Sequence, residues 1–369
     1  MAELSDTLFY VALGVYVLAM VAYFFAMAFT RVTVDGVLSS TAAGTRAGRV
    51  GTVLALFGLT THLGSSVLRG LETGRIPLGN MFEYSSVIAL LAVAGGLFVV
   101  QARWGHVHLM GFVLAGATLM MGSGWLLFVP AGPLVPALES YWFNIHVTAM
   151  VGSAAIFMLA FLATALYLAR DTAERRVAAR SGQRFGAGTV GAASVDVGDG
   201  RDAVTADSVV ASPLELRRAL SPGWFVALPA ILLGLYGSQG GARGVVGAAA
   251  VGGALGGWAW YAMPHLPSAG ELDTLAYRIT AFAMPIYTFG VICGAIWAEE
   301  AWGRYWGWDP KETGAFFTWV LYAAYLHARA TYGWRGRRAA WVGITAYVAL
   351  LVTYFVVNLV VVGLHSYAT

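Results

Sequence analysis

The stretch from Trp297 to Lys311, WAEEAWGRYWGWDPK, concentrates side chains that can bind a flat, charged ligand. It holds four of the chain's 13 tryptophans and five charged residues, which are Trp297, Trp302, Trp306, Trp308, Glu299, Glu300, Arg304, Asp309 and Lys311. Indole rings stack on flat apolar molecules and bury much apolar surface in doing so. The stretch therefore predicts a surface for a planar ligand. The alternative is a belt of aromatic residues at a membrane interface, which needs no ligand.

Two histidines in distant segments have the chemistry to complete such a site. His146 ends the segment PAGPLVPALESYWFNIH, and His365 lies in GLHSY near the end of the chain. A neutral imidazole nitrogen is a good axial ligand for haem iron, and two imidazoles can bind the iron from opposite faces. The haem propionates need cations, for which Arg304 is the first candidate and Lys311 the second. The alternative for each histidine is a polar residue at the membrane interface.

A third histidine, His327, lies 18 residues after Asp309. This spacing places it ~27 Å along a helix and near the inner side of a bilayer. Ionisable residues inside membrane spans are costly and usually functional. Small neighbours leave room there for a large ligand, whereas a plain boundary residue beside Arg329 is the alternative. His62 is a further histidine inside an apolar run, and we expect neighbouring threonine and serine hydroxyls to satisfy it within a helix bundle.

The sequence Asp309-Pro310-Lys311-Glu312 has a second, structural interpretation. Asp309 can cap a helix whose first residue is Pro310, and Glu312 stands at the third helical position. This is the pattern of a capping box, with aspartate in the role of serine or threonine. We expect both interpretations to hold, because such a cap fixes where the tryptophan-rich stretch lies.

The elements that must position these residues are membrane helices. The chain is 59% hydrophobic and 11% charged, with a mean hydropathy of +0.70. About 20 apolar residues cross a bilayer as a helix. The pattern predicts an all-α polytopic membrane protein with about eight transmembrane helices, at 8–29, 50–68, 83–101, 109–129, 146–168, 279–298, 313–331 and 340–362. A glycine-rich apolar hairpin at 223–265 raises this number to ten if it crosses twice.

Charge and cysteine content exclude several functions. The net charge is only +3 and basic residues do not alternate with aromatic ones on any face, so a nucleic-acid partner is not expected. The single cysteine, Cys293, rules out an internal disulfide and a CxxC redox pair. The chain also has no CxxCH motif for covalent haem. No basic residue precedes the first apolar run, so we expect no cleavable signal peptide.

Composition divides the chain into four parts. Residues 1–169 form an N-terminal five-helix membrane part, and residues 170–222 read as a flexible cytoplasmic insert rich in glycine, alanine, serine and arginine. Residues 223–265 are the glycine-rich hairpin, and 266–369 form a C-terminal three-helix part with the tryptophan-rich loop. With both termini outside, inner loops hold 17 of the 22 lysines and arginines. The positive-inside rule therefore places both termini and that loop on the external face.

Five segments resemble a known family. The stretch WAEEAWGRYWGWDPKET resembles the tryptophan-rich WWD motif of haem-handling proteins, and PLGNMFEYS, PLVPALESYWFNIHV, YLHAR and NLVVVGLHSY also fit. Together they resemble the CcsA (ResC) family, called CcsB in some bacteria, which is the haem-handling subunit of system II cytochrome c biogenesis. The similarity covers most of the chain outside 1–48 and 170–265.

This resemblance implies a multi-pass protein of the bacterial plasma membrane that works with a CcsB/ResB-type partner. Such proteins move haem b outward and present it, bound non-covalently, to apocytochrome c for thioether formation at CxxCH. By motif, His146 and His365 match paired external axial ligands of the iron, and His327 matches an intramembrane ligand. Trp302, Trp306, Trp308, Asp309 and Arg304 fall in the haem-contacting motif. The resemblance assigns no residue a catalytic role.

Two other functions stand beside this one. A system I haem handler of the CcmC or CcmF type shares the tryptophan motif, but the GLHSY terminus favours system II. A secondary transporter or quinone-linked carrier would show internal repeats and charges at broken helices within the membrane. The unusual residues here are mostly in external segments, which favours a haem-handling role.

Overall fold

The computed structural model describes residues 1–32, 38–134, 136–180, 213–219 and 241–363, and nearly all of them are helical. The strands β1 (Thr30–Val32) and β2 (Leu38–Ser40) pair antiparallel, with Thr30 opposite Ser40. The long helices are α1 (Ala2–Ala28), α2 (Ala42–Thr73), α3 (Met81–Gly95), α4 (Met110–Leu126), α5 (Tyr141–Arg180), α8 (Gly241–Ala262), α9 (Ala269–Trp302), α10 (Pro310–Thr331) and α11 (Arg337–Leu351).

Shorter helical elements extend or connect these. The π-helical turns η1 (Gly96–Arg103) and η5 (Val352–Val357) continue α3 and α11, and η5 leads into α12 (Asn358–Val360). The remaining pieces are α6 (Pro213–Ala219) and the 3-10 turns η2 (Val107–Leu109), η3 (Pro136–Leu138) and η4 (Met263–His265).

Eight helical stretches among the described residues are long and apolar enough to cross a membrane. This confirms the predicted all-α polytopic membrane protein. Seven of them coincide with predicted spans, and the eighth, Val245–His265, falls in the second half of the predicted glycine-rich hairpin. The first half of that hairpin lies outside the described residues, as does most of the predicted insert at 170–222. The predicted span 313–331 forms α10, which has the length of a span but is more polar, because it carries His327, Arg329 and several threonine and tyrosine residues.

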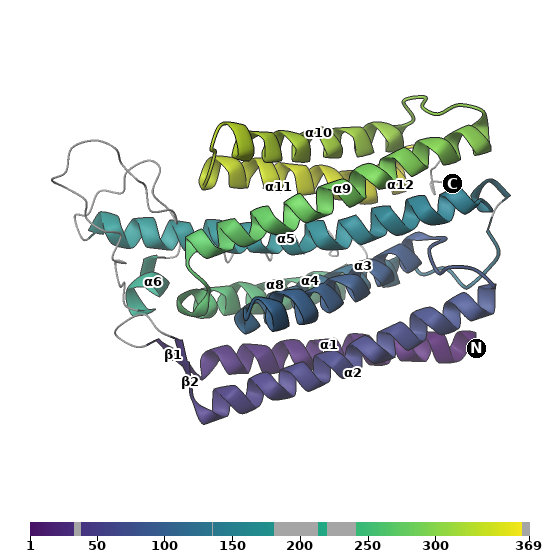
Figure 1. Ribbon diagram of the computed structural model, residues 1–369. Helices are drawn as coiled ribbons and strands as arrows, with labels where there is room; N and C mark the ends of the chain where they lie inside the picture. The colour runs from purple at the N-terminus through teal and green to yellow at the C-terminus, as the bar shows by residue number, and fades with distance from the viewer. Residues whose placement is uncertain (33–37, 135, 181–212, 220–240, 364–369) are drawn as a thin grey trace. The chain divides into compact units, whose positions relative to one another are not determined.

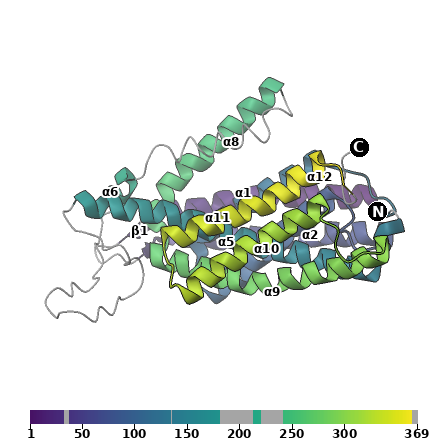
Figure 2. The same cartoon turned by 90° about the horizontal axis from the view of Figure 1, so that it is seen from above.

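The chain folds as two compact units. The first comprises Met1–Tyr23, Arg49–Ala165 and Asp273–Thr369, and the second comprises Phe24–Gly48 and Leu166–Leu272. In the first unit, long helices run roughly antiparallel, and α10 and α11 lie side by side (Figure 1, Figure 2). The start of α1, the α4–α5 and α9–α10 connections and α12 gather at one end of this unit (Figure 1). That end carries the segments with the predicted site.

The second unit is held by contacts between α1, β1, α5, α8 and η4. The rings of Phe24 and Trp258 lie 4.6 Å apart. His265 Nε2 is 2.7 Å from the carbonyl oxygen of Thr30, and Arg170 donates to the carbonyl oxygen of Met263. Because a carbonyl only accepts, Nε2 of His265 carries a proton. His265 is therefore a buried packing residue in a 3-10 turn.

A buried ion pair joins α9 and α10 in the first unit. Arg329 Nη1 lies 2.7 Å from Asp273 Oδ1, and both side chains are less than a tenth exposed. The Arg329 guanidinium also stands over the ring of Tyr277, 4.7 Å from its centroid. A buried charge that keeps its partner and its hydrogen bonds is tolerated, whereas one that loses its partner is strongly destabilising.

We therefore expect Arg329→Ala to lower the free energy of unfolding by about 3–5 kcal/mol, because Asp273 is left buried without its cation. Thermal or denaturant unfolding of the purified protein in detergent measures this. Arg335→Ala is the matched control, since Arg335 is exposed beyond the end of α10, and its effect should stay within about 0.5 kcal/mol. Equal stability of the two variants would contradict a stabilising role for the pair.

Candidate functional site

A cavity of about 530 Å³ lies in the first unit, within the range of roughly 300–1,000 Å³ that is usual for small-molecule and cofactor sites. Its walls come from the α2–α3 and α4–α5 connections, the start of α5, the end of α9, the α9–α10 loop, the start of α10 and the η5–α12 segment. Among the lining residues are Tyr84, His146, Trp297, Trp302, Trp306 and Lys311. The cavity thus joins a predicted histidine to the predicted aromatic stretch.

His146 projects from the first turns of α5 against α9. Its Nδ1 lies 2.7 Å from the carbonyl oxygen of Gly290, which can only accept a hydrogen bond. Nδ1 therefore carries the proton, and in the neutral ring the lone pair is on Nε2. A histidine held in this way by a carbonyl group has a fixed tautomer, as metal-bound histidines do. A Cβ at Gly294 would stand 2.6 Å from His146 Nδ1, so glycine is needed for this approach.

The tryptophans divide between the cavity and its rim. The ring of Trp297 is stacked at 5.9 Å from that of His146, with 19° between the planes, and Trp302 packs edge-on against Trp297 at 4.9 Å. Trp302 and Trp306 also line the cavity. Trp308 does not line it, is 63% exposed and packs against Trp306 at 5.8 Å. Three indoles thus form the cavity wall, and the fourth lies outside.

The predicted helix cap is present and fixes the loop that carries these rings. Asp309 accepts a hydrogen bond from the backbone N–H of Lys311, and Glu312 Oε2 accepts one from the N–H of Asp309 at 3.1 Å. Glu312 also accepts from Gly307 N at 2.8 Å and pairs with Arg304 at 3.3 Å. Arg304 therefore serves the loop and does not line the cavity. Trp308 is held at φ 56°, a left-handed conformation that costs a non-glycine residue roughly 1–2 kcal/mol.

Lys311 supplies positive charge to the cavity wall. Burial lowers the pKa of its ammonium group to about 8, although the nearby Asp309 carboxylate raises it. The ammonium is therefore still mostly charged at pH 7 and loses its charge as the pH rises past 8. A bound anion would restore its affinity for the proton, since an opposite charge favours the charged form.

The last described residues of the chain reach the same loop. A Cβ at Gly363 would stand 2.7 Å from Asp309 Oδ2, so the backbone there passes directly against the cap of α10. His365 itself lies outside the described residues. Because Gly363 is only two positions earlier, the chain enters the His365 segment from beside the aromatic loop.

The other two candidate histidines lie away from the cavity. His327 is on an exposed face of α10 and contacts Thr331 and Tyr332. It follows Lys311 by 16 residues, or ~24 Å along the helix. His62 is fully buried, and its Nε2 lies 2.8 Å from the hydroxyl oxygen of Ser86, a hydroxyl partner on α3 rather than α2. A hydroxyl group thus contacts His62 as expected, but it comes from a neighbouring helix and not from the residues next to His62 in sequence.

Two further cavity residues, Tyr354 and Asn358, received no predicted role from the sequence. Tyr354 and Asn358 face the cavity from the π-helical turn η5 and from α12. Tyr354 forms a 2.8 Å hydrogen bond with Ser85 on α3. Turns of this kind are common at functional sites. A π-turn changes which side chains share a helix face, so a periodicity of 3.6 residues does not place these two side chains in the cavity.

The contact between Gly294 and His146 can be tested through stability. Gly294→Ala should lower the free energy of unfolding by about 1–3 kcal/mol, because the new methyl group displaces the His146 ring and its hydrogen bond to Gly290. Gly152→Ala is the control, since a Cβ there meets no atom within 4 Å; it should leave stability unchanged or raise it by up to about 1 kcal/mol. If both variants were equally stable, the His146 ring would not be constrained as described.

Known proteins share this sequence over most of its length. Residues 78–365 match the family described as "Cytochrome C assembly protein". The chain is 33% identical over 323 residues to "Cytochrome c biogenesis protein CcsA" of Gloeobacter violaceus, covering 86% of each protein. It is 31% identical over 325 residues to the protein of the same name from Gloeothece citriformis, covering 87% of each. The chain therefore belongs to the cytochrome c assembly protein family.

Proposed function

We propose that this protein holds haem b non-covalently in the cavity and presents it to apocytochrome c for covalent attachment at CxxCH. Its family supports the broader role in cytochrome c biogenesis. The observation that carries the finer proposal is His146, which stands in an aromatic-walled cavity with its lone pair on Nε2. Haem is the cargo of this site and leaves it as part of the product.

The residues of the cavity fit a haem. The Nε2 atom of His146 can bind the iron, and His365, two positions after Gly363, is the proposed second axial ligand. Trp297, Trp302 and Trp306 offer apolar ring surface to the porphyrin. Lys311 is the proposed partner of a propionate in preference to Arg304, because Lys311 lines the cavity and Arg304 does not. Trp308 contributes at the exposed rim, and Asp309 acts by capping α10.

The chain's own residues orient the cargo. When haem is bound, its iron and vinyl groups, together with the thiols of apocytochrome c, supply the bond-forming chemistry. The aromatic wall excludes water from the porphyrin faces and leaves one edge toward the mouth of the cavity. One of the two histidines then yields its place to the histidine of CxxCH. This exchange lets the haem leave with the cytochrome.

A second haem position is proposed at His327, on the way to the cavity. Its imidazole lies on an exposed face of α10. A site open on one side is completed by another chain, and we propose a CcsB/ResB-type membrane partner for this role. The separation of ~24 Å along α10 from Lys311 makes this position distinct from the cavity.

We expect His146→Ala and His365→Ala each to abolish cytochrome c maturation, because each removes an axial ligand of the iron, while the protein still inserts into the membrane. Covalent haem staining of a reporter cytochrome c measures this, with membrane content of the variant as the check on insertion. His106→Ala is the matched control, since His106 does not line the cavity. A double variant of His146 and His365 that matured cytochrome c at the normal rate would end the ligand assignment.

The proposed orientation places both termini and the tryptophan-rich loop outside the cell. In a variant lacking the buried Cys293, a cysteine at the exposed Tyr305 should react with an impermeant thiol reagent applied to whole cells. A cysteine at Arg335, beyond the other end of α10, should react only after the membrane is opened. Labelling of position 335 but not 305 from outside would reverse the arrangement.

A further inference from the structure

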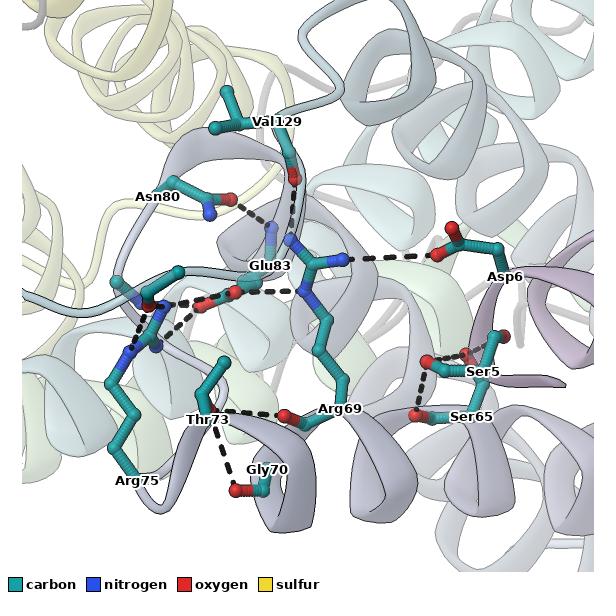
Figure 3. A network of polar contacts seen from close by, with 12 residues as sticks. Ser5, Asp6, Ser65, Arg69, Gly70, Thr73, Arg75, Asn80, Glu83 and Val129 are labelled. Carbon is teal, nitrogen blue, oxygen red and sulfur yellow. Dashed lines mark hydrogen bonds and ion pairs between the residues drawn. The ribbon is translucent and has the colours of Figure 1, made fainter. Parts of the chain in front are cut away.

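A buried carboxylate, Glu83, lies at the start of α3 and gathers donors from three directions (Figure 3). Its side chain has no exposed surface. Oε1 accepts from Arg69 Nε at 2.8 Å, and Oε2 accepts from Arg75 Nη1 at 2.8 Å and from the backbone N–H of Gly79 at 2.7 Å. A charged group this deeply buried is stable only when it is paired and fully hydrogen-bonded, as Glu83 is.

The same two arginines also hold the connection between α4 and α5. Arg69 Nη2 donates to the carbonyl oxygen of Val129 at 2.5 Å, as Figure 3 shows, and Arg75 donates to that of Gly132 at 3.2 Å. Val129 and Gly132 line the cavity, whereas Glu83 does not. The carboxylate thus acts on the cavity through two guanidinium groups. We call the segment Val129–Leu134 the strap.

The strap is also locked against the α2–α3 connection. A Cβ at Gly79 would stand 2.6 Å from both Arg75 Nη1 and Leu134 Cδ2. Arg75 is therefore enclosed by the backbone of Gly79, the Glu83 carboxylate and the strap. Lysine cannot reproduce this, because a single ammonium lacks the planar fork that reaches a carboxylate and a carbonyl together.

The network is balanced in charge and extends to the start of the chain. Asp6 on α1 lies 3.8 Å from Arg69, so two carboxylates face two guanidinium groups. Neutralising Glu83 would leave two buried arginines with one distant carboxylate, and their bonds to the strap would lose the charge that orients them.

We propose that Glu83 is a positioning residue that fixes the strap as one wall of the cavity and so sets how tightly the cavity encloses its ligand. The identity of that ligand as haem rests on the proposed function; the positioning of the strap does not. Glu83 itself touches no ligand. Its effect on the cavity should appear first as motion of the strap and second as weaker retention of the cargo.

The test uses the full chain with Cys293→Ser and Leu134→Cys, which places a thiol on the strap. Adding Glu83→Gln should raise the rate of thiol labelling in detergent by about tenfold, because the strap opens more often once its anchors are loosened. Glu139→Gln, the same change at an exposed position in the α4–α5 connection, should leave the rate unchanged. An unchanged rate in the folded Glu83→Gln protein would overturn the proposal.

A second variant covers the case in which Glu83→Gln does not fold. Gly79→Ala keeps the carboxylate but drives a methyl group into Arg75, so it should also raise labelling of the strap cysteine; labelling equal to that of the parent would contradict the inference. Haem retained per protein is measured in parallel and should fall in both variants. If the parent itself retained no haem, the proposed function would fail, while the labelling result would still decide the role of Glu83.

Discussion

The carboxylate of Glu312 is the group around which the tryptophan-rich loop folds. It is 9% exposed, and it receives the N–H groups of Gly307 and Asp309 and the guanidinium of Arg304. These bonds hold an irregular segment against the first turn of α10, where the helix dipole also favours negative charge. The placement of Trp306 and Lys311 on the cavity wall follows from this anchor. The close approach of the backbone at Gly363 to the Asp309 carboxylate also depends on this anchor.

Glu83 is a second buried carboxylate that anchors a connection, on another side of the cavity. Each carboxylate lies within three residues of a helix start and binds both a backbone N–H of the preceding connection and an arginine. Near a bilayer, irregular backbone needs internal partners, because unsatisfied polar groups are costly where water is scarce. Two buried carboxylates thus allow loops to form walls, while α5 supplies His146 and α9 supplies Trp297 and Trp302.

Local chemistry made part of this arrangement predictable. The capping box of Asp309 and Glu312 depends on neighbouring residues only, and long apolar runs indicate membrane spans directly. The predicted cap and the predicted helical membrane fold were therefore correct. The pairing of Arg304 with Glu312 was not predictable. In the sequence, an arginine that binds a ligand cannot be distinguished from one that pairs with a carboxylate of its own loop. The contact of His146 with Gly290 joins residues far apart in sequence. α8 was obscured by its glycines, which left open whether its segment crosses the membrane.

The central claim is that His146 and His365 bind one iron from opposite faces in the aromatic cavity. The absorption and electron paramagnetic resonance spectra of the chain, purified in detergent with its haem, test this most directly. Two imidazole ligands give a six-coordinate, low-spin haem, and His146→Gly should convert it to a high-spin form that added imidazole returns to low spin. A low-spin spectrum that is identical in the parent chain and in the His146→Gly variant would contradict the account.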